Sequence, residues 1–298
     1  MGTTPRTATP VLKSPRSDSN VDAGPRDVTK VDGATTTQQR SVTPLGIAAP
    51  ITFSGVRVER GGATVLDVEQ LEIDPGYTAL VGPNGSGKST MLHAIAGLLR
   101  PSAGSVVIPQ PAAKGSSSNS TRVAYVLQSQ NTSEHLLVTA REVVQLARRG
   151  GALRRMHRQD RRIVEEVMER LGVADLANRH LADMSGGQRQ RVFIAQGLAQ
   201  DADILLLDEP IAGLDLASEQ TIRRAIDDDR ASGRTVIVAT HDLDEAKRAD
   251  QVVMMNGSVV AVGSPAEVLR PDNLRKAYRG RVLELGDGSV AVDDDHHH

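Results

Sequence analysis

The stretch that decides the fold is Gly82-Pro83-Asn84-Gly85-Ser86-Gly87-Lys88-Ser89-Thr90. It matches the phosphate-loop pattern of a glycine, four further residues, and Gly-Lys-Ser/Thr. Directly before it, residues 77–81 have the length and apolar character of a buried strand. Directly after it, residues 89–99 have the pattern of a helix, which Arg100-Pro101 would end. A strand, this loop and a helix in that order predict a nucleoside triphosphate site at the end of a sheet strand.

Each residue type in the loop suits a triphosphate. Glycines let backbone N–H groups turn toward phosphates without interference from a Cβ, and the helix adds its positive N-terminal end. We expect Lys88 to bridge the β- and γ-phosphates and Ser89 to offer its hydroxyl to Mg²⁺. The alternative is a glycine-rich turn without a ligand, which the flanking strand and helix and the Lys-Ser pair disfavour.

Two carboxylates follow another apolar run, residues 204–207. We expect Asp208 to hold Mg²⁺, directly or through water, and Glu209 to polarise an attacking water as general base. The carboxyl end of a strand is where α/β sheets bind ligands. An acidic strand end is common by chance, and this one gains weight from the phosphate loop upstream.

Two polar residues at the ends of further apolar runs are weaker candidates. His241 follows residues 235–240 and could reach the γ-phosphate, although a single histidine is more often structural. Gln128 follows residues 123–127, and its amide could contact Mg²⁺ or the attacking water. Taken alone, Gln128 is a very weak signal.

A second glycine motif is Met184-Ser185-Gly186-Gly187-Gln188. Ser185 is a good N-cap for a helix that continues through Leu198, and two glycines at a helix N-terminus make a second anion site. The simpler interpretation is an ordinary capped helix. A further possibility is that this site closes on a nucleotide held by another copy of the chain.

Composition excludes several classes of function. The net charge of the 298 residues is −2 with neutral histidines, so bulk charge gives no reason to expect a nucleic-acid partner. The chain has no cysteine, which excludes disulfides and thiolate metal sites, and only five aromatic residues, which disfavours a stacking platform for single strands. No apolar run approaches a membrane span, so we expect another chain to supply any span.

The chain divides into three parts. Residues 1–48 are rich in polar residues and proline, and we expect a disordered extension, with a regulatory or docking tail as the alternative. Residues 49–265 form the expected globular domain, with an antiparallel edge region near residues 56–73 and a hairpin around Asn256-Gly257. Residues 266–298 form a C-terminal extension with an Asp/His-rich tail.

A helical insertion is expected within the domain at about residues 129–190. Residues 142–149 and 159–171 have amphipathic patterns, and the side chains expected to point inward are Val143, Val144, Leu146, Ile163, Val164, Val167 and Leu171. The insertion also carries a basic run between Arg148 and Arg162. We interpret that run as a solvated helix face, with a surface for a partner or for lipid headgroups as the alternative.

In its order of motifs the chain resembles the ATP-binding subunits of ABC transporters, from about Ile51 to Gly263. The motifs are Walker A at residues 82–90, the Gln-loop residue Gln128, the signature at residues 184–188, Walker B at residues 204–209, the D-loop Gly213-Leu214-Asp215 and the switch residue His241. The resemblance implies an α/β P-loop NTPase of ABC type. Its RecA-like core would have a mostly parallel sheet, an antiparallel β edge region and an inserted α-helical subdomain.

The resemblance also implies partners and roles. Two copies would form a head-to-tail dimer with two ATP molecules between them, each held by Mg²⁺ and by the motifs of both copies. Glu209 would be the general base, with His241 and Gln128 as further catalytic residues; Mg²⁺ would be held by Ser89, Gln128 and Asp208. The residues expected to bind the nucleotide from the second copy are Ser185, Gly186, Gly187 and Gln188, and Asp215 would communicate across the dimer.

Such subunits act at the cytoplasmic face of the cell membrane with permease subunits, and importers also use an extracytoplasmic substrate-binding protein. Residues 250–278 resemble the ending found in importers of zinc or manganese, and the tail at residues 293–298 is rich in metal-ligand types. A truncated purification tag or an unstructured tail is the alternative for that tail. The alternatives for the function are import of iron chelates or haem and, in a different class, a soluble ABC-type ATPase acting on ribosomes or DNA.

Two positions depart from the family pattern. Met184 stands where leucine is commoner, a change between apolar side chains of similar volume. Arg60 stands before Gly61-Gly62, where many relatives place an aromatic residue that stacks on adenine. Because this position is not aromatic, we assign no aromatic contact to adenine. The guanidinium plane of an arginine can also stack on a base.

Overall fold

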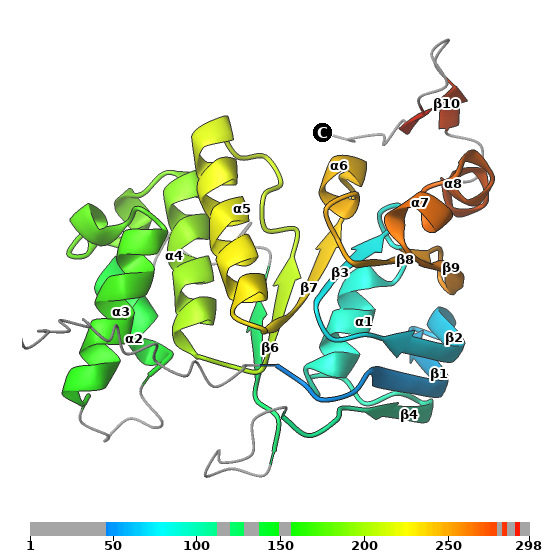
Figure 1. The fold of residues 1–298 in the computed structure, drawn as a ribbon, viewed down its shortest axis with the longest axis horizontal. Helices are drawn as coiled ribbons and strands as arrows, with labels where there is room; N and C mark the ends of the chain where they lie inside the picture. Colours follow the sequence, from blue (N-terminus) through cyan, green and yellow to red (C-terminus); the bar gives the residue numbers. More distant parts are fainter. Residues whose placement is uncertain are drawn as a thin grey trace, which may run out of the picture. The chain divides into compact units, whose positions relative to one another are not determined.

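The computed structural model describes residues 46–111, 120–127, 137–148 and 156–278, together with the backbone of two short strands, β10 (Val282–Glu284) and β11 (Val290–Val292). Its centre is a six-stranded sheet in the order β5-β6-β7-β3-β8-β9 (Figure 1). Neighbouring strands are parallel except for the antiparallel pair β8 and β9. The strands are β3 (Tyr77–Val81), β5 (Val123–Val126), β6 (Ile204–Asp208), β7 (Thr235–Thr240), β8 (Gln251–Met255) and β9 (Val259–Gly263).

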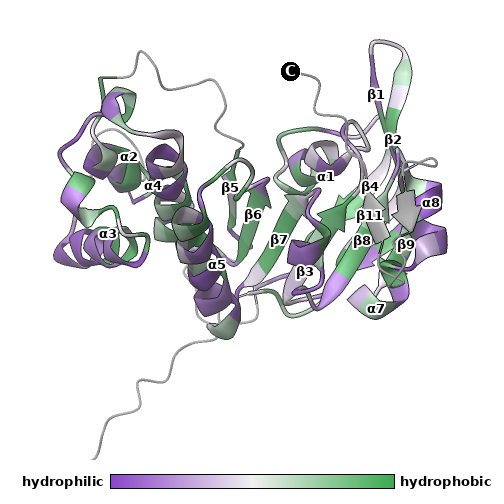
Figure 2. Ribbon diagram, turned by 90° about the horizontal axis from the view of Figure 1, so that it is seen from above, coloured by the Kyte–Doolittle hydropathy of each residue, from purple (hydrophilic) through white to green (hydrophobic). Residues whose placement is uncertain are grey.

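The central strands are apolar on both sides because both faces of the sheet are covered. Every residue of β3, β6 and β7 is buried, and Figure 2 shows these strands as largely hydrophobic. Alternate side chains of one strand enter two different cores: Leu205 and Leu207 enter one, Ile204 and Leu206 the other. This is the burial expected of parallel strands, and it explains why their sequences are continuous apolar runs.

One face is covered by helix α1 (Lys88–Ile95) and by a three-stranded antiparallel sheet in the order β2-β1-β4. Its strands are β1 (Ile51–Arg60), β2 (Ala63–Ile73) and β4 (Ala103–Val107). The register of β1 against β2 runs from Ile51 opposite Ile73 to Arg60 opposite Ala63. The expected antiparallel edge region is therefore confirmed.

The other face is covered by helices, which share one apolar core with it. They are α4 (Gly186–Ala199), α5 (Leu216–Ala231), α6 (Leu243–Ala246), α7 (Pro265–Val268) and α8 (Pro271–Tyr278). The expected fold class, a mostly parallel α/β core with an antiparallel edge and a helical insertion, is confirmed. None of the helices in the described ranges is both long and apolar enough to pass through a bilayer.

The helical insertion lies between β5 and β6. It contains α2 (Ala140–Leu146), α3 (Arg158–Arg170) and two 3₁₀ turns, 174–176 and 181–183, and both α-helices pack on α4. The expected inward position of Leu146 is wrong, because its side chain is 56% exposed. The buried residues of α2 are Ala140, Val143 and Val144, which recur at the spacing of one helix face. Leu146, six residues after Ala140, projects from a different face.

Helix α1 ends at Ile95, four residues earlier than expected. Gly97 adopts a left-handed φ of 68°, and its N–H donates to the carbonyl of Ala94. The N–H of Leu98 donates to the carbonyl of His93, which completes a Schellman ending. The glycine therefore stops the helix before Arg100-Pro101 can.

Several sequence-based expectations fall on residues outside the described ranges. These are residues 1–45 of the expected extension, Gln128, part of the basic run (Arg149, Arg154 and Arg155) and the Asp/His-rich tail. Residues 46–48, which we assigned to the extension, are described: Ile47 is buried and forms an isolated antiparallel bridge with Pro111. The domain boundaries stay a prediction.

Candidate active site

The phosphate loop runs from the end of β3 to the start of α1, as its sequence predicts. Gly82 has a φ of 154°, and a Cβ there would lie 2.2 Å from the carbonyl oxygen of Met255. Only glycine fits at this approach of the loop to β8. The backbone of the loop is thereby fixed against the sheet.

The loop offers donors for an anion. Among the described residues no side chain caps the N-terminus of α1, and the buried hydroxyl oxygen of Ser86 has no hydrogen-bond partner there. The Nζ atom of Lys88 donates to the carbonyls of Gly82 at 2.7 Å and Pro83 at 3.1 Å, and its side chain is 6% exposed. A positive charge and a helix N-terminus thus converge inside one loop, which suits a phosphate group.

Asp208 ends β6 with its carboxylate held from the neighbouring strand. The hydroxyl of Tyr125 on β5 donates to its Oδ2 atom at 3.2 Å, and the two residues belong to adjacent parallel strands. Burial, and then the charge of Asp208, raises the pKa of the Tyr125 hydroxyl well above its ordinary value. Tyr125 therefore stays protonated and remains a donor to Asp208.

The oxygen donors here suit Mg²⁺. Asp208 and Ser89 offer a carboxylate and a hydroxyl, which are hard ligands of the kind that this ion prefers. In the described ranges no group of three or more His, Asp and Glu side chains could hold a metal ion by itself. Mg²⁺ is usually bound by one or two protein oxygens together with substrate phosphates, so this sparse set fits that ion.

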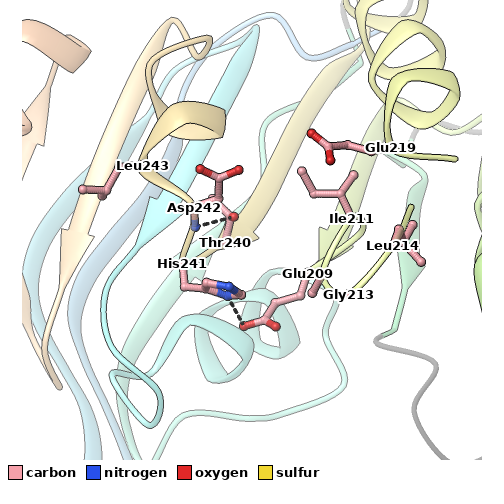
Figure 3. A pocket seen from close by; sticks show the side chains of 10 residues that line it. Glu209, Ile211, Gly213, Leu214, Glu219, Thr240, His241, Asp242 and Leu243 are labelled. Atoms are coloured by element: carbon pink, nitrogen blue, oxygen red, sulfur yellow. Dashed lines mark hydrogen bonds and ion pairs between the residues drawn. The ribbon is translucent and has the colours of Figure 1, made fainter. Parts of the chain in front are cut away.

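Glu209 and His241 lie next to each other in the lining of a cavity of about 410 Å³ (Figure 3). The Oε1 atom of Glu209 lies 3.5 Å from the Nδ1 atom of His241. Glu209 has a left-handed φ of 46°, rare for a residue with a side chain, and its N–H donates to the carbonyl of Ala239 on β7. Such strain costs on the order of 1–3 kcal/mol and tends to occur where function requires it.

The lining of the cavity also includes the D-loop, α5 and the residue that follows His241. Gly213 and Leu214 of the D-loop, Glu219 of α5 and Asp242 after His241 line it. Asp215 caps α5, since its side chain accepts hydrogen bonds from the backbone N–H and the hydroxyl of Ser218. These bonds lower the pKa of Asp215, which keeps the cap ionised.

The signature motif begins α4 with a capping box. The hydroxyl of Ser185 accepts from the N–H of Gln188 at 3.3 Å, and the side chain of Gln188 accepts from the N–H of Ser185 at 3.1 Å. The predicted N-cap is confirmed. A Cβ on Gly187 would lie 3.0 Å from the hydroxyl of Ser218 and 3.3 Å from the carboxylate of Asp215. The signature therefore packs on the start of α5.

The sheet order explains which predicted residues come together. Strands β6, β7 and β3 are neighbours, so their carboxyl ends place Asp208 and Glu209, His241 and the phosphate loop at one edge. Gln128 falls outside the described residues. Tyr125 was not predicted as a site residue. Its hydroxyl is a polar group within an apolar run, but the sequence does not show that this run pairs with β6.

Known proteins are similar to this chain. A family model described as "ABC transporter" matches residues 67–212. The cobalamin import ATP-binding protein BtuD of Halobacterium salinarum is 40% identical over 248 residues, which cover 80% of this chain and 62% of that relative. The manganese transport system ATP-binding protein MntB of Bacillus subtilis is 33% identical over 246 residues, which cover 81% of this chain and 97% of MntB.

A solved structure is also similar to this chain in fold. It is a dimeric ATP-binding cassette in a post-hydrolysis state, bound to ADP and Pi, with a TM-score of 0.61 and 27% identity over 72% of this chain and 98% of that one. The relatives share sequence over most of the domain, and the solved structure shares its fold. This chain belongs to the ABC transporter family, and its domain is the ATP-binding cassette of that family.

Proposed function

We propose that this chain is the ATP-hydrolysing subunit of an ABC transporter that imports a transition metal, zinc or manganese. The observation that carries the ATPase assignment is the placement of Glu209 and His241, 3.5 Å apart, at the sheet edge that also ends in the phosphate loop. A carboxylate base, a histidine and a phosphate-binding lysine at one edge are the parts that phosphoryl transfer to water requires.

The residues then have distinct roles. The loop from Gly82 to Thr90 binds the phosphates, with Lys88 as the point charge, and Asp208 and Ser89 hold Mg²⁺, which neutralises charge on the phosphates when bound. Glu209 accepts a proton from the attacking water, and His241 orients that water and the γ-phosphate. Gln128 completes the Mg²⁺ and water contacts.

The site is completed by a second copy in a head-to-tail dimer. Ser185, Gly186, Gly187 and Gln188 of one copy contact the nucleotide held by the other. Support comes from the capped helix start of α4 and from the dimeric cassette to which this chain is similar. ATP binding closes the dimer, and hydrolysis opens it, because the γ-phosphate is the ligand that both copies share.

The proposed partners follow from the family. The chain works with membrane permease subunits at the cytoplasmic face of the membrane, and an extracytoplasmic substrate-binding protein delivers the cargo. Nucleic acid is not a partner in this proposal, because the charge is nearly balanced. The alternative function, a soluble ATPase that acts on ribosomes or DNA, predicts ATPase activity that nucleic acid stimulates.

The cargo proposal is supported by the manganese transport relative and by the zinc or manganese resemblance of residues 250–278. A metal chelate, such as an iron chelate or haem, is the second candidate, and the cobalamin import relative favours that class. Deletion of the chain in its host, followed by single-metal rescue, separates the two. Restoration of growth and cell metal content by free manganese or zinc supports the first, and restoration only by an iron source contradicts it.

Two measurements test the assignment as a transporter subunit. The purified chain with Mg²⁺ and ATP should release phosphate at a rate that saturates with ATP and vanishes when the metal is chelated. Affinity purification from detergent-solubilised membranes should recover a protein with several membrane spans. Recovery of ribosomal proteins instead, with nucleic-acid-stimulated hydrolysis, would contradict the transporter assignment.

Arg60 is expected to contribute to adenine binding through its guanidinium plane. It is exposed at the end of β1, opposite Ala63 across a glycine turn. Arg60→Ala should weaken ATP binding about two- to fivefold, since an exposed cation–π contact contributes about 0.5–1 kcal/mol. Isothermal titration calorimetry measures this. Arg57→Ala, on the same strand, is the matched control, and equal affinities of both variants and the wild type would exclude the contact.

A further inference from the structure

A single guanidinium on α5 holds three carboxylates beside the candidate active site. The Nη1 atom of Arg223 lies 2.9 Å from Glu219, Nη2 lies 3.3 Å from Asp242, and Nε lies 2.8 Å from Glu245. The guanidinium thus forms ion pairs with three acids, and its contact with Asp242 is also a hydrogen bond. The Nε atom of Arg223 and the Oε2 atom of Glu245 are close and buried, but neither has a hydrogen-bond partner among the described residues. Two of those acids belong to the segment after β7 and one belongs to α5 itself.

The cluster is buried at Glu245 and open to water at Asp242, whose side chain is 38% exposed. The side chain of Arg223 is 23% exposed and that of Glu245 is 2% exposed. Glu245 also accepts a hydrogen bond from the hydroxyl of Tyr77, at the start of β3. Burial, and then the charge of Glu245, raises the pKa of Tyr77, so that the hydroxyl stays a donor. Arg223 forms an ion pair with the buried carboxylate of Glu245, and the charge of Arg248 also acts on that carboxylate.

The cluster continues into the segment that carries His241. Asp242 follows His241 directly; its N–H donates to the hydroxyl of Thr240 at 3.0 Å, and its Oδ1 atom accepts from the N–H of Asp244 at 2.8 Å. Asp242 and Glu219 line the same cavity as Glu209 and His241, as Figure 3 shows. A side chain that fixes Asp242 therefore fixes the backbone next to His241.

We propose that Arg223 is a positioning residue for ATP hydrolysis, which clamps the segment 241–245 to α5 and so sets the distance between His241 and Glu209. The inference rests on the proposed function and adds to it a residue outside the family motifs. Since Asp215 of the D-loop caps α5, the same clamp couples the D-loop to His241.

The planar guanidinium of Arg223 predicts different effects for lysine and methionine at this position. Lysine supplies one point charge and cannot meet three acids from three directions, whereas methionine removes the charge and keeps the stem. We expect Arg223→Met to lower kcat about tenfold with the KM for ATP within about twofold, as for a group that acts on the transition state and not on ground-state binding. Arg223→Lys should recover part of kcat.

A second readout does not depend on turnover. In protein labelled with ¹⁵N-histidine, the imidazole signals of His241, assigned by their loss in His241→Asn, report its surroundings directly. They should shift in Arg223→Met and move back toward the wild type in Arg223→Lys. Arg224→Met, at the exposed neighbouring position of the same helix, is the matched control and should leave kcat and these signals unchanged.

If Arg223→Met does not fold, Asp242→Asn provides the test. It removes one acid from the fork, leaves Glu245 paired with Arg223, and keeps an N-cap residue for α6. We expect a severalfold lower kcat and shifted His241 signals at an unchanged Tm.

An unchanged kcat and unchanged His241 signals in a folded variant at position 223 or 242 would overturn the inference. A wild-type chain without ATPase activity would instead overturn the proposed function, while the His241 signals would still decide whether Arg223 positions the histidine.

Discussion

Replacing Glu209 by glutamine should reduce ATP hydrolysis about a hundredfold or more while ATP binding persists, because loss of a placed general base removes that much rate. Glutamine has the size of glutamate and can accept a hydrogen bond, but it cannot take a proton from water. The side chain is 14% exposed and lies 3.5 Å from His241, so bulk water cannot easily replace its role.

The same variant should reveal the dimer. With hydrolysis blocked, the γ-phosphate stays in place, and the two copies should remain closed on ATP. Size-exclusion chromatography with light scattering should show a dimer that requires ATP and Mg²⁺. The strained φ of 46° at this position is the same for both side chains, so the Tm should be unchanged.

The control for Glu209 is the same chemical change at an exposed site. Glu169→Gln on α3 should retain the wild-type rate. A Glu209→Gln protein that hydrolyses ATP at the wild-type rate would show that another group is the base.

Replacing Lys88 by alanine should weaken ATP binding by roughly tenfold to more than a hundredfold, because hydrogen bonds to charged groups contribute about 1.5–3 kcal/mol. The lysine is 6% exposed and already directed into the loop, where its Nζ atom bonds two backbone carbonyls. Its removal takes away two bonds to the loop backbone and the charge that we propose for the β- and γ-phosphates.

Calorimetric titration of ATP gives the affinity, and thermal unfolding reports any loss of loop structure. Lys276→Ala, at an exposed position of α8, removes a lysine elsewhere and should bind ATP as the wild type does. Wild-type affinity in folded Lys88→Ala would exclude the phosphate role of this lysine.

The parts of the fold that could be predicted are those with strong local signals. Continuous apolar runs predicted the buried strands around Leu80, Leu206 and Val238, and Asn256-Gly257 predicted the hairpin of β8 and β9. Ser185 predicted the start of α4. Each depends on residues close together in the chain, so its physical cause is visible in the sequence.

The misses came from competing local and tertiary effects. Gly97 ended α1 before the proline signal that we had used, because its left-handed backbone closes the helix. Leu146 is apolar but lies off the face of α2 that packs on α4. The sequence did not indicate roles for Tyr125 and Arg223. Their partners, Asp208 and Asp242, are 83 and 19 residues away in the chain.

The sequence by itself determined the kind of chemistry, because the phosphate loop is a specific local pattern and the acidic strand end and the capped signature follow it in the order of one family. The tertiary structure decided how they work together. The order β5-β6-β7-β3 places Glu209, His241 and the loop at one edge, and it brings Tyr125 on β5 to Asp208 on β6. The packing of α5 beside the segment after β7 brings Arg223 to Asp242. Strand order and cross-strand contacts arise from the packing of segments distant in the chain, and no short window of sequence contains that information.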